Sequence, residues 1–204
     1  MDFAKWLEYI FPPSQDEVLV KRLNRNDFLS LCYTAKLNSN TQSLSFFSEP
    51  SVRASIHLAK FHHHTKAIDL LSILLKRHLD TLSSPHILIP VPLSNTRYRQ
   101  RGYNQVTEII NHTLNQTDKH QLKDDILIRI KNTPPQTSLS RHARKSNLHN
   151  AFTVKNIKYA KKILKDKKVL VVDDVTTTGT TFKEIEKVLK KIPGSKLSFL
   201  SLAH

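Results

Sequence analysis

The segment KKVLVVDDVTTTGTTFKEIEKVLKKI, residues 167–192, constrains the fold more than any other part of the chain. Its continuous apolar run predicts a buried strand that delivers two adjacent acids, Asp173 and Asp174. A threonine- and glycine-rich stretch follows, and residues 182–192 then have the spacing of an amphipathic helix. A buried strand that leads directly into a helix is a unit of α/β folds.

Helices and strands alternate along most of the chain. Apolar residues take helix-compatible spacings from about residue 51, and again over residues 103–114. Short apolar runs predict strands at 86–93, 125–130, 151–154 and 196–204. Such alternation implies parallel pairing through right-handed crossovers, so we predict an open, mainly parallel sheet flanked by helices. Ligands of such sheets bind at the carboxyl ends of the strands.

Charge divides the chain near residue 50. Residues 1–50 carry a net charge of -1 and residues 51–204 carry +16, within a total of +15. The first segment also has an irregular pattern, so we predict a small N-terminal appendage at 1–50 and a main domain at 51–204. The basic domain favours polyanionic partners, either a phosphorylated small molecule or a nucleic-acid backbone. Solvated lysine faces are an alternative reading of the same charge.

The sequence contains no sign of membrane insertion or export. No run approaches the roughly 20 apolar residues of a membrane-spanning helix. The start, MDFAKWLEYIFPP, carries acids and a proline pair and does not resemble a signal peptide. Cys32 is the single cysteine and cannot form an internal disulfide. We therefore expect a cytoplasmic protein.

The order strand, acids, loop, helix suits a phosphate site. Backbone N–H groups of residues 177–181 can converge on a phosphate at the positive end of the helix. Gly179 permits a tight turn there, and it is one of three glycines in the chain. Asp173 and Asp174 can accept hydrogen bonds from ribose hydroxyls or hold a metal. The Gly-Lys-Ser/Thr ending of a P-loop is absent.

Two further segments carry candidate anion ligands. In IPVPLSNTRYRQRGYNQ, residues 89–105, a strand end is followed by Arg97, Arg99 and Arg101, which could donate bidentate hydrogen bonds to a diphosphate. The second segment, TPPQTSLSRHARKSNLHNAF at 133–152, lies in a long polar connection. A loop of that length is either functional or disordered.

The strand–acid–loop segment resembles the signature of type I phosphoribosyltransferases that binds phosphoribosyl diphosphate (PRPP). The resemblance implies that the two acids address the ribose hydroxyls and that residues 176–181 hold the 5-phosphate. The implied PRPP-binding set is Asp173, Asp174, Val175, Thr176, Thr177, Thr178, Gly179, Thr180 and Thr181.

All three segments together resemble the ComF family of competence-associated, phosphoribosyltransferase-like proteins. The matching positions are Pro90, Pro92, Arg101, Gly102, Tyr103, Asn104, Gln105, Gln136, Leu139, Arg144, Asn147, Ala151 and Phe152. Candidates for the diphosphate or its loops are Val91, Pro92, Leu93, Arg97, Arg101 and Arg144. The resemblance covers about residues 55–203 and implies a type I phosphoribosyltransferase-like fold.

The resemblance implies a PRPP-binding protein that handles single-stranded DNA during DNA uptake, with Mg²⁺ accompanying PRPP. DNA-uptake helicases and recombination proteins are further candidate partners. The alternative is an active transferase that moves the ribose phosphate of PRPP to a nucleobase or another nucleophile. The PRPP half of such a site is present in the sequence, whereas no base-recognising segment has an obvious pattern, so binding is better supported than turnover.

One departure from the family concerns zinc. Many ComF relatives begin with a four-cysteine zinc finger, but only Cys32 is present here, and Ala35 stands where a further ligand would be. A single thiolate cannot build a structural zinc site. We therefore expect no zinc.

Overall fold

The computed structural model describes residues 13–131 and 149–204, whose main element is a six-stranded sheet. The strand order is β1-β2-β8-β7-β3-β4, and every neighbouring pair is parallel except β1 with β2. The strands are β1 (Ala35–Lys36), β2 (Thr41–Ser43), β3 (Ile87–Pro90), β4 (Gln121–Leu122), β7 (Lys168–Val175) and β8 (Lys196–Ala203). The expected open, mainly parallel sheet is confirmed.

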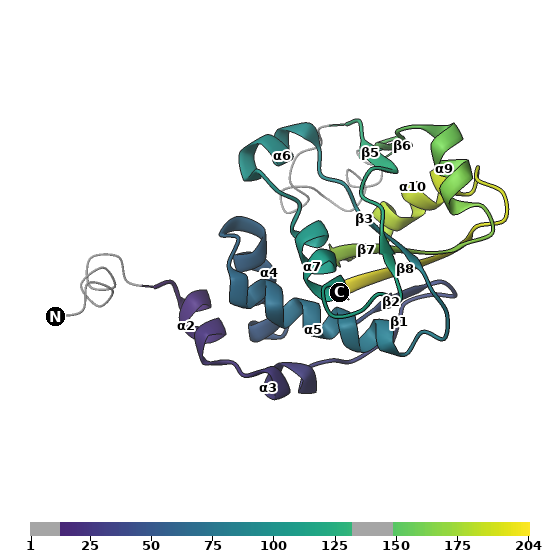
Figure 1. Cartoon of the computed structure of the whole chain (residues 1–204). Coiled ribbons are helices and arrows are strands. Elements are labelled where there is room, and N and C mark those ends of the chain that lie inside the picture. Colours follow the sequence, from purple (N-terminus) through teal and green to yellow (C-terminus); the bar gives the residue numbers. More distant parts are fainter. Residues whose placement is uncertain (1–12, 132–148) are drawn as a thin grey trace.

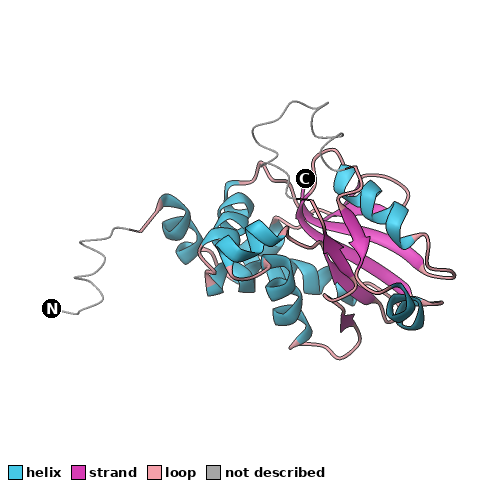
Figure 2. Cartoon of the chain, turned by 90° about the horizontal axis from the view of Figure 1, so that it is seen from above, coloured by secondary structure: helices cyan, strands magenta, loops and turns pink. Residues whose placement is uncertain are grey.

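Helices cover both faces of this sheet (Figures 1 and 2). One face packs against α4 (Pro50–Phe61), α5 (Thr65–Asp80) and α7 (Gln105–Leu114), and the other against α9 (Ile157–Leu164) and α10 (Thr180–Leu189). Strand β7 supplies both cores, because successive side chains of a strand point to opposite faces. Leu170 and Val172 join the first core, and Val169 and Val171 join the second.

The described part of the N-terminal segment shares the sheet and core of the main domain. Helices α2 (Gln15–Arg22) and α3 (Arg25–Ser30) bury Val20 and Phe28 in the core formed with α4 and α5. Ser14 and Glu17 form a capping box, which explains why α2 begins there. Strand β2 pairs with β8. The domain boundary at residue 50 stays a prediction. It marks a change in net charge, because residues on both sides of it contribute strands to one sheet.

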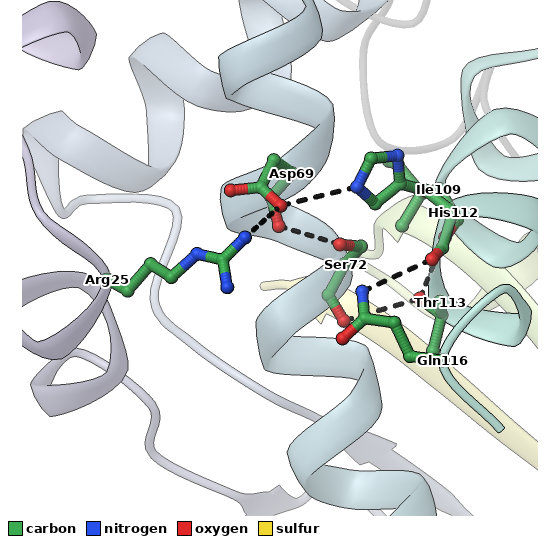
Figure 3. Close-up of polar contacts among 7 residues, drawn as sticks. All are labelled: Arg25, Asp69, Ser72, Ile109, His112, Thr113 and Gln116. Atoms are coloured by element: carbon green, nitrogen blue, oxygen red, sulfur yellow. Dashed lines mark hydrogen bonds and ion pairs between the residues drawn. The ribbon is translucent and has the colours of Figure 1, made fainter.

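A polar cluster joins this segment to the helical layer (Figure 3). The Asp69 carboxylate on α5 lies 2.9 Å from Nη2 of Arg25 and 3.2 Å from Nε2 of His112 on α7. Thr113 on α7 donates to the main-chain carbonyl of Ser72 on α5. Arg25 is mostly exposed, so its ion pair contributes little to stability, about 0–1 kcal/mol. The cluster orients three helices against one another.

Several short elements differ from the sequence-based expectations. Residues 95–101 form a helix, α6 (Asn95–Arg101), between a Ser94 N-cap and a left-handed Gly102. Strands β5 (Leu127–Arg129) and β6 (Phe152–Val154) form a separate antiparallel pair outside the main sheet. The main sheet instead contains β1, β2 and β4, whose two or three residues each are too few for a periodic pattern. None of the described helices is long and apolar enough to cross a bilayer.

Candidate functional site

The direction of chain crossovers changes between β3 and β7. These strands are parallel neighbours, yet the chain leaves β3 through α6 and α7 toward β4, whereas it leaves β7 through α10 toward β8. The helices α7 and α10 accordingly pack on opposite faces (Figure 1). Open α/β sheets bind their ligands at the carboxyl edge, beside such a change in crossover direction. Two of the three predicted segments meet at this edge.

Asp173 and Asp174 occupy the end of β7 at this edge. Asp174 is 7% exposed, and its carboxylate accepts hydrogen bonds from Nε2 of Gln105 at 2.6 Å and from the backbone N–H of Val175 at 2.7 Å. The Lys60 ammonium lies 3.5 Å from the same carboxylate. The Asp173 carboxylate accepts the backbone N–H of Asp174 at 2.9 Å.

The two acids have opposite electrostatic environments. Burial opposes ionisation of Asp174, but Lys60, the Val175 N–H and Gln105 outweigh it and lower its pKa. Burial and the neighbouring charge of Asp174 raise the pKa of Asp173 well above the ordinary carboxyl value. Adjacent titratable groups whose pKa values are driven apart are typical of functional sites. Asp173 is half-buried and suited to a ligand that donates hydrogen bonds to it.

The threonine loop follows the acids and ends at α10. Thr176 is buried, and its N–H donates to the carbonyl of Ala203 at 3.0 Å, so the loop is anchored to β8. Gly179 is the N-cap of α10 with φ of 68°, a left-handed conformation that favours glycine, and no side chain caps the helix there. Thr178 and Thr180 hydroxyls lie 2.8 Å apart. The first turn of α10 therefore presents N–H groups and hydroxyls at a positive helix end.

The loop after β3 lies beside the acids. Val91 continues the pairing with β7, since its N–H donates to the carbonyl of Val172 at 2.8 Å. The carbonyl of Val91 accepts a hydrogen bond from Nδ2 of Asn104 at 3.0 Å. Pro92 and Leu93, half-buried, lead to the N-cap of α6. The Val91–Leu93 loop and the Asp173–Asp174 pair thus lie together at the carboxyl edge of the sheet.

The three arginines of α6 do not lie on one face of the helix. On a helix, residues two apart do not face each other, whereas residues four apart do, so Arg99 does not share the face of Arg97 and Arg101. Arg97 and Arg101 are half-buried and Arg99 is exposed. The Arg101 guanidinium donates to Oε1 of Gln105, which in turn donates to Asp174. Arg101 is therefore linked to the acid pair through one side chain.

Sequence reasoning assigned no role to four residues at this edge. Gln105 and Asn104 were part of a recognised motif without a role of their own. Lys60 ends an ordinary amphipathic helix and carried no signal. Arg129 is a basic residue inside the apolar run DILIRI, and this unusual placement could have been noticed in the sequence. Its side chain is 9% exposed, and its guanidinium lies 5.5 Å from the centroid of the Phe152 ring. Burial lowers its pKa to about 10. Phe152 is buried in the core.

The remaining predicted positions differ in what the structure says of them. Gln136, Leu139, Arg144 and Asn147 lie outside the described residues. His62, His63 and His64 form the turn between α4 and α5, where the His64 ring accepts the N–H of Ala67. Among residues 13–131 and 149–204, no group of three or more His, Cys, Asp or Glu side chains is placed to hold a metal.

A hollow of about 820 Å³ lies elsewhere, among α3, α5 and α7. Its lining includes Arg25, Lys66, Asp69 and His112. Figure 3 draws Arg25, Asp69 and His112. The hollow is wide open and contains the structural ion pairs described above. We place the candidate site at the strand ends, where the phosphate-binding pattern, the acid pair and the crossover reversal coincide.

Comparison with known proteins gives curated relatives. The chain is 36% identical to competence protein F of Haemophilus influenzae over 60% of this chain and 52% of that protein. It is 32% and 31% identical to the DNA utilization protein YhgH of Shigella flexneri and of Escherichia coli K12, over 69% of this chain and 61% of each. These matches support the resemblance to the ComF family that the sequence segments carry. The chain spans about half to three fifths of the length of these relatives, and no family model matches it.

Solved structures similar to this chain include phosphoribosyltransferases. Adenine phosphoribosyltransferase of Leishmania tarentolae aligns over 84% of this chain and 94% of that chain, with 13% identity and a TM-score of 0.45. Hypoxanthine phosphoribosyltransferase of Staphylococcus aureus aligns over 66% and 61%, with 15% identity and a TM-score of 0.36.

Proposed function

We propose that this chain binds PRPP together with Mg²⁺ at the carboxyl edge of the sheet, between the ends of β3 and β7, and that it handles single-stranded DNA during DNA uptake. One observation carries the proposal: the crossover reversal brings Asp173 and Asp174 and the Val91–Leu93 loop to one edge. The first turn of α10 supplies phosphate donors beside the acids. The names of the relatives, a competence protein and a DNA utilization protein, support the DNA part.

The residues present fit a ribose phosphate and its metal. Asp173 and Asp174 would accept hydrogen bonds from the ribose hydroxyls, and the loop at 176–181 would hold the 5-phosphate. Arg101, fixed by Gln105, would face the diphosphate. Mg²⁺ prefers oxygen ligands and, when bound with PRPP, would neutralise part of the diphosphate charge.

A calorimetric titration tests the ligand. Mg²⁺ and PRPP titrated together into the full chain should give about one site per chain, and affinity should fall when Mg²⁺ is removed, because the diphosphate charge is then less neutralised. An assay of diphosphate release against a panel of nucleobases belongs beside it. Binding without release supports the binding protein, and release with one base would establish the transferase alternative. No heat at millimolar PRPP would reject the ligand.

The affinity for single-stranded DNA should depend strongly on salt. The charge of +16 over residues 51–204 releases counterions on binding, so log affinity should fall by about 0.7 per log unit of salt for each phosphate neutralised. Fluorescence anisotropy at several salt concentrations measures that slope. Binding that is absent even at low salt would contradict the DNA part. PRPP should compete with DNA if Arg101 serves both ligands and should leave DNA binding unchanged if the sites are separate.

A further inference from the structure

The exposed ring of Phe61 lies beside the candidate site. Phe61 is the last residue of α4 and is 58% exposed. The guanidinium of Arg101 lies 5.3 Å from its ring centroid, and the ammonium of Lys60 lies 5.7 Å from it. These cations also reach the acid pair, Lys60 directly and Arg101 through Gln105. One aromatic surface is therefore continuous with the proposed ribose-phosphate site.

The solvent-facing side of α4 leads to this ring. Helix positions four apart share a face, and Arg53, His57 and Phe61 are all exposed, whereas Val52, Ile56 and Ala59 are buried. His57 pairs with Asp16 and lies 5.1 Å from the Phe61 ring. A large aromatic side chain at the end of a basic and polar stripe has no role in the core. Such a stripe resembles surfaces that combine phosphate contacts with base stacking.

The turn after Phe61 is held by Tyr103. Its hydroxyl donates to the carbonyl of Ala59 at 2.8 Å and accepts the N–H of His63 at 2.9 Å. The His63 ring lies 4.4 Å from the Tyr103 ring, and His63 has a φ of 48°, in the left-handed region. A non-glycine residue in that region is retained where its surroundings fix it. The end of α4 is therefore ordered in advance of any ligand.

We propose that Phe61 is a stacking platform for a nucleobase of single-stranded DNA, with Arg101 and Lys60 attracting the adjoining phosphates. This inference rests on the proposed function for its location beside the ribose-phosphate site. The chemistry favours DNA because bases stack on aromatic rings with little sequence preference, and cations beside the ring attract the backbone. A free nucleobase has the same ring but no phosphate for the flanking cations.

The test compares a thymidine oligonucleotide with an abasic oligonucleotide of the same length. Wild type should bind the thymidine oligonucleotide about tenfold more tightly, because every base has a π face that can stack on the Phe61 ring. Phe61→Leu keeps an apolar side chain but removes the ring, so it should abolish this preference. Phe61→Trp should restore it. Tyr33→Leu, which removes a ring of 57% exposure stacked on Phe46, is the matched control and should retain it.

Two further measurements show whether the bound base comes from DNA or from a free nucleoside, and whether the PRPP site is intact. If Phe61→Leu loses binding of a free nucleoside but keeps the oligonucleotide preference, the ring binds a free base and the assignment to single-stranded DNA is rejected. If Phe61→Leu changes neither, the platform is rejected. Calorimetry with Mg²⁺ and PRPP on the same variant should give wild-type affinity within about threefold. If wild type does not bind PRPP, the proposed PRPP-binding function is rejected. The preference for the thymidine oligonucleotide would still decide whether Phe61 is a stacking platform.

Discussion

Replacing both Asp173 and Asp174 with Asn is expected to weaken PRPP binding at least about 100-fold. Each carboxylate would accept a charge-assisted hydrogen bond from a ribose hydroxyl, and such bonds contribute about 1.5–3 kcal/mol each. Losing two therefore costs about 3 kcal/mol or more, equivalent to at least two orders of magnitude in Kd. Asn keeps the size of the side chain and can still accept the backbone N–H groups that the acids accept now. Calorimetry on the folded double variant measures the loss, and unchanged affinity would reject the ribose assignment.

The single variant Asp173→Asn should raise stability while it weakens binding. Because the pKa of Asp173 is raised in the folded state, its ionisation lowers the stability of the wild-type protein as pH rises above the ordinary carboxyl value. Asn does not ionise, so the variant should melt about 2–4 °C higher at pH 7, equivalent to roughly 1 kcal/mol. The gain should disappear below about pH 4, where Asp is protonated in both states. Thermal melts at both pH values test this, and a lower melting temperature at pH 7 would contradict the environment described for Asp173.

Acid should destabilise the fold through His78. Burial, and then the nearby His86, lower its pKa to about 4 from an ordinary 6.5, so the folded state takes up the proton less readily than the unfolded chain. Stability is then fully present above pH 6.5 and declines as pH falls toward 4. At about 1.36 kcal/mol for each pKa unit, the loss is about 3 kcal/mol by pH 4.

Urea unfolding at pH 7 and at pH 4.5 measures this loss. His78→Gln removes the titrating group and should lose less stability between the two pH values than wild type. His86 and His120 also have lowered pKa values because of burial and should leave the variant with part of the acid sensitivity. An acid-induced loss of the same size in the variant would show that His78 is not the responsible group. The Asp173→Asn variant still contains His78, so it should still show the loss of stability in acid that depends on His78. Comparing the two variants therefore separates the effect of the Asp173 carboxyl from that of the His78 ring.

The strand and helix at the centre of the site were predictable because their patterns are long and regular. Strand β7 and helix α10 lie within a few residues of the ranges expected from apolar periodicity. Helix α6 was missed because it buries no residue and so has no apolar stripe. Its signals are local ones, the Ser94 N-cap and the Gly102 end, which an apolar pattern does not include.

The partners of the acid pair could not be inferred from local patterns. Gln105 and Asp174 are 69 residues apart in the sequence, and only the pairing of β3 with β7 brings the turns after these strands together. Lys60 reaches the same carboxylate from α4, an element whose spacing gave no sign of a polar role. The sequence identified the phosphate-binding chemistry, and the tertiary fold determined which cations and amides surround it.

Hydrogen–deuterium exchange of the full chain, with and without PRPP and Mg²⁺, tests the location of the site most directly. PRPP with Mg²⁺ should slow exchange in two segments far apart in the sequence, residues 91–101 and residues 173–183, and should leave exchange at the far ends of β3 and β7 unchanged. Protection confined to other segments, or none at saturating PRPP, would contradict a PRPP site at the carboxyl edge between these strands.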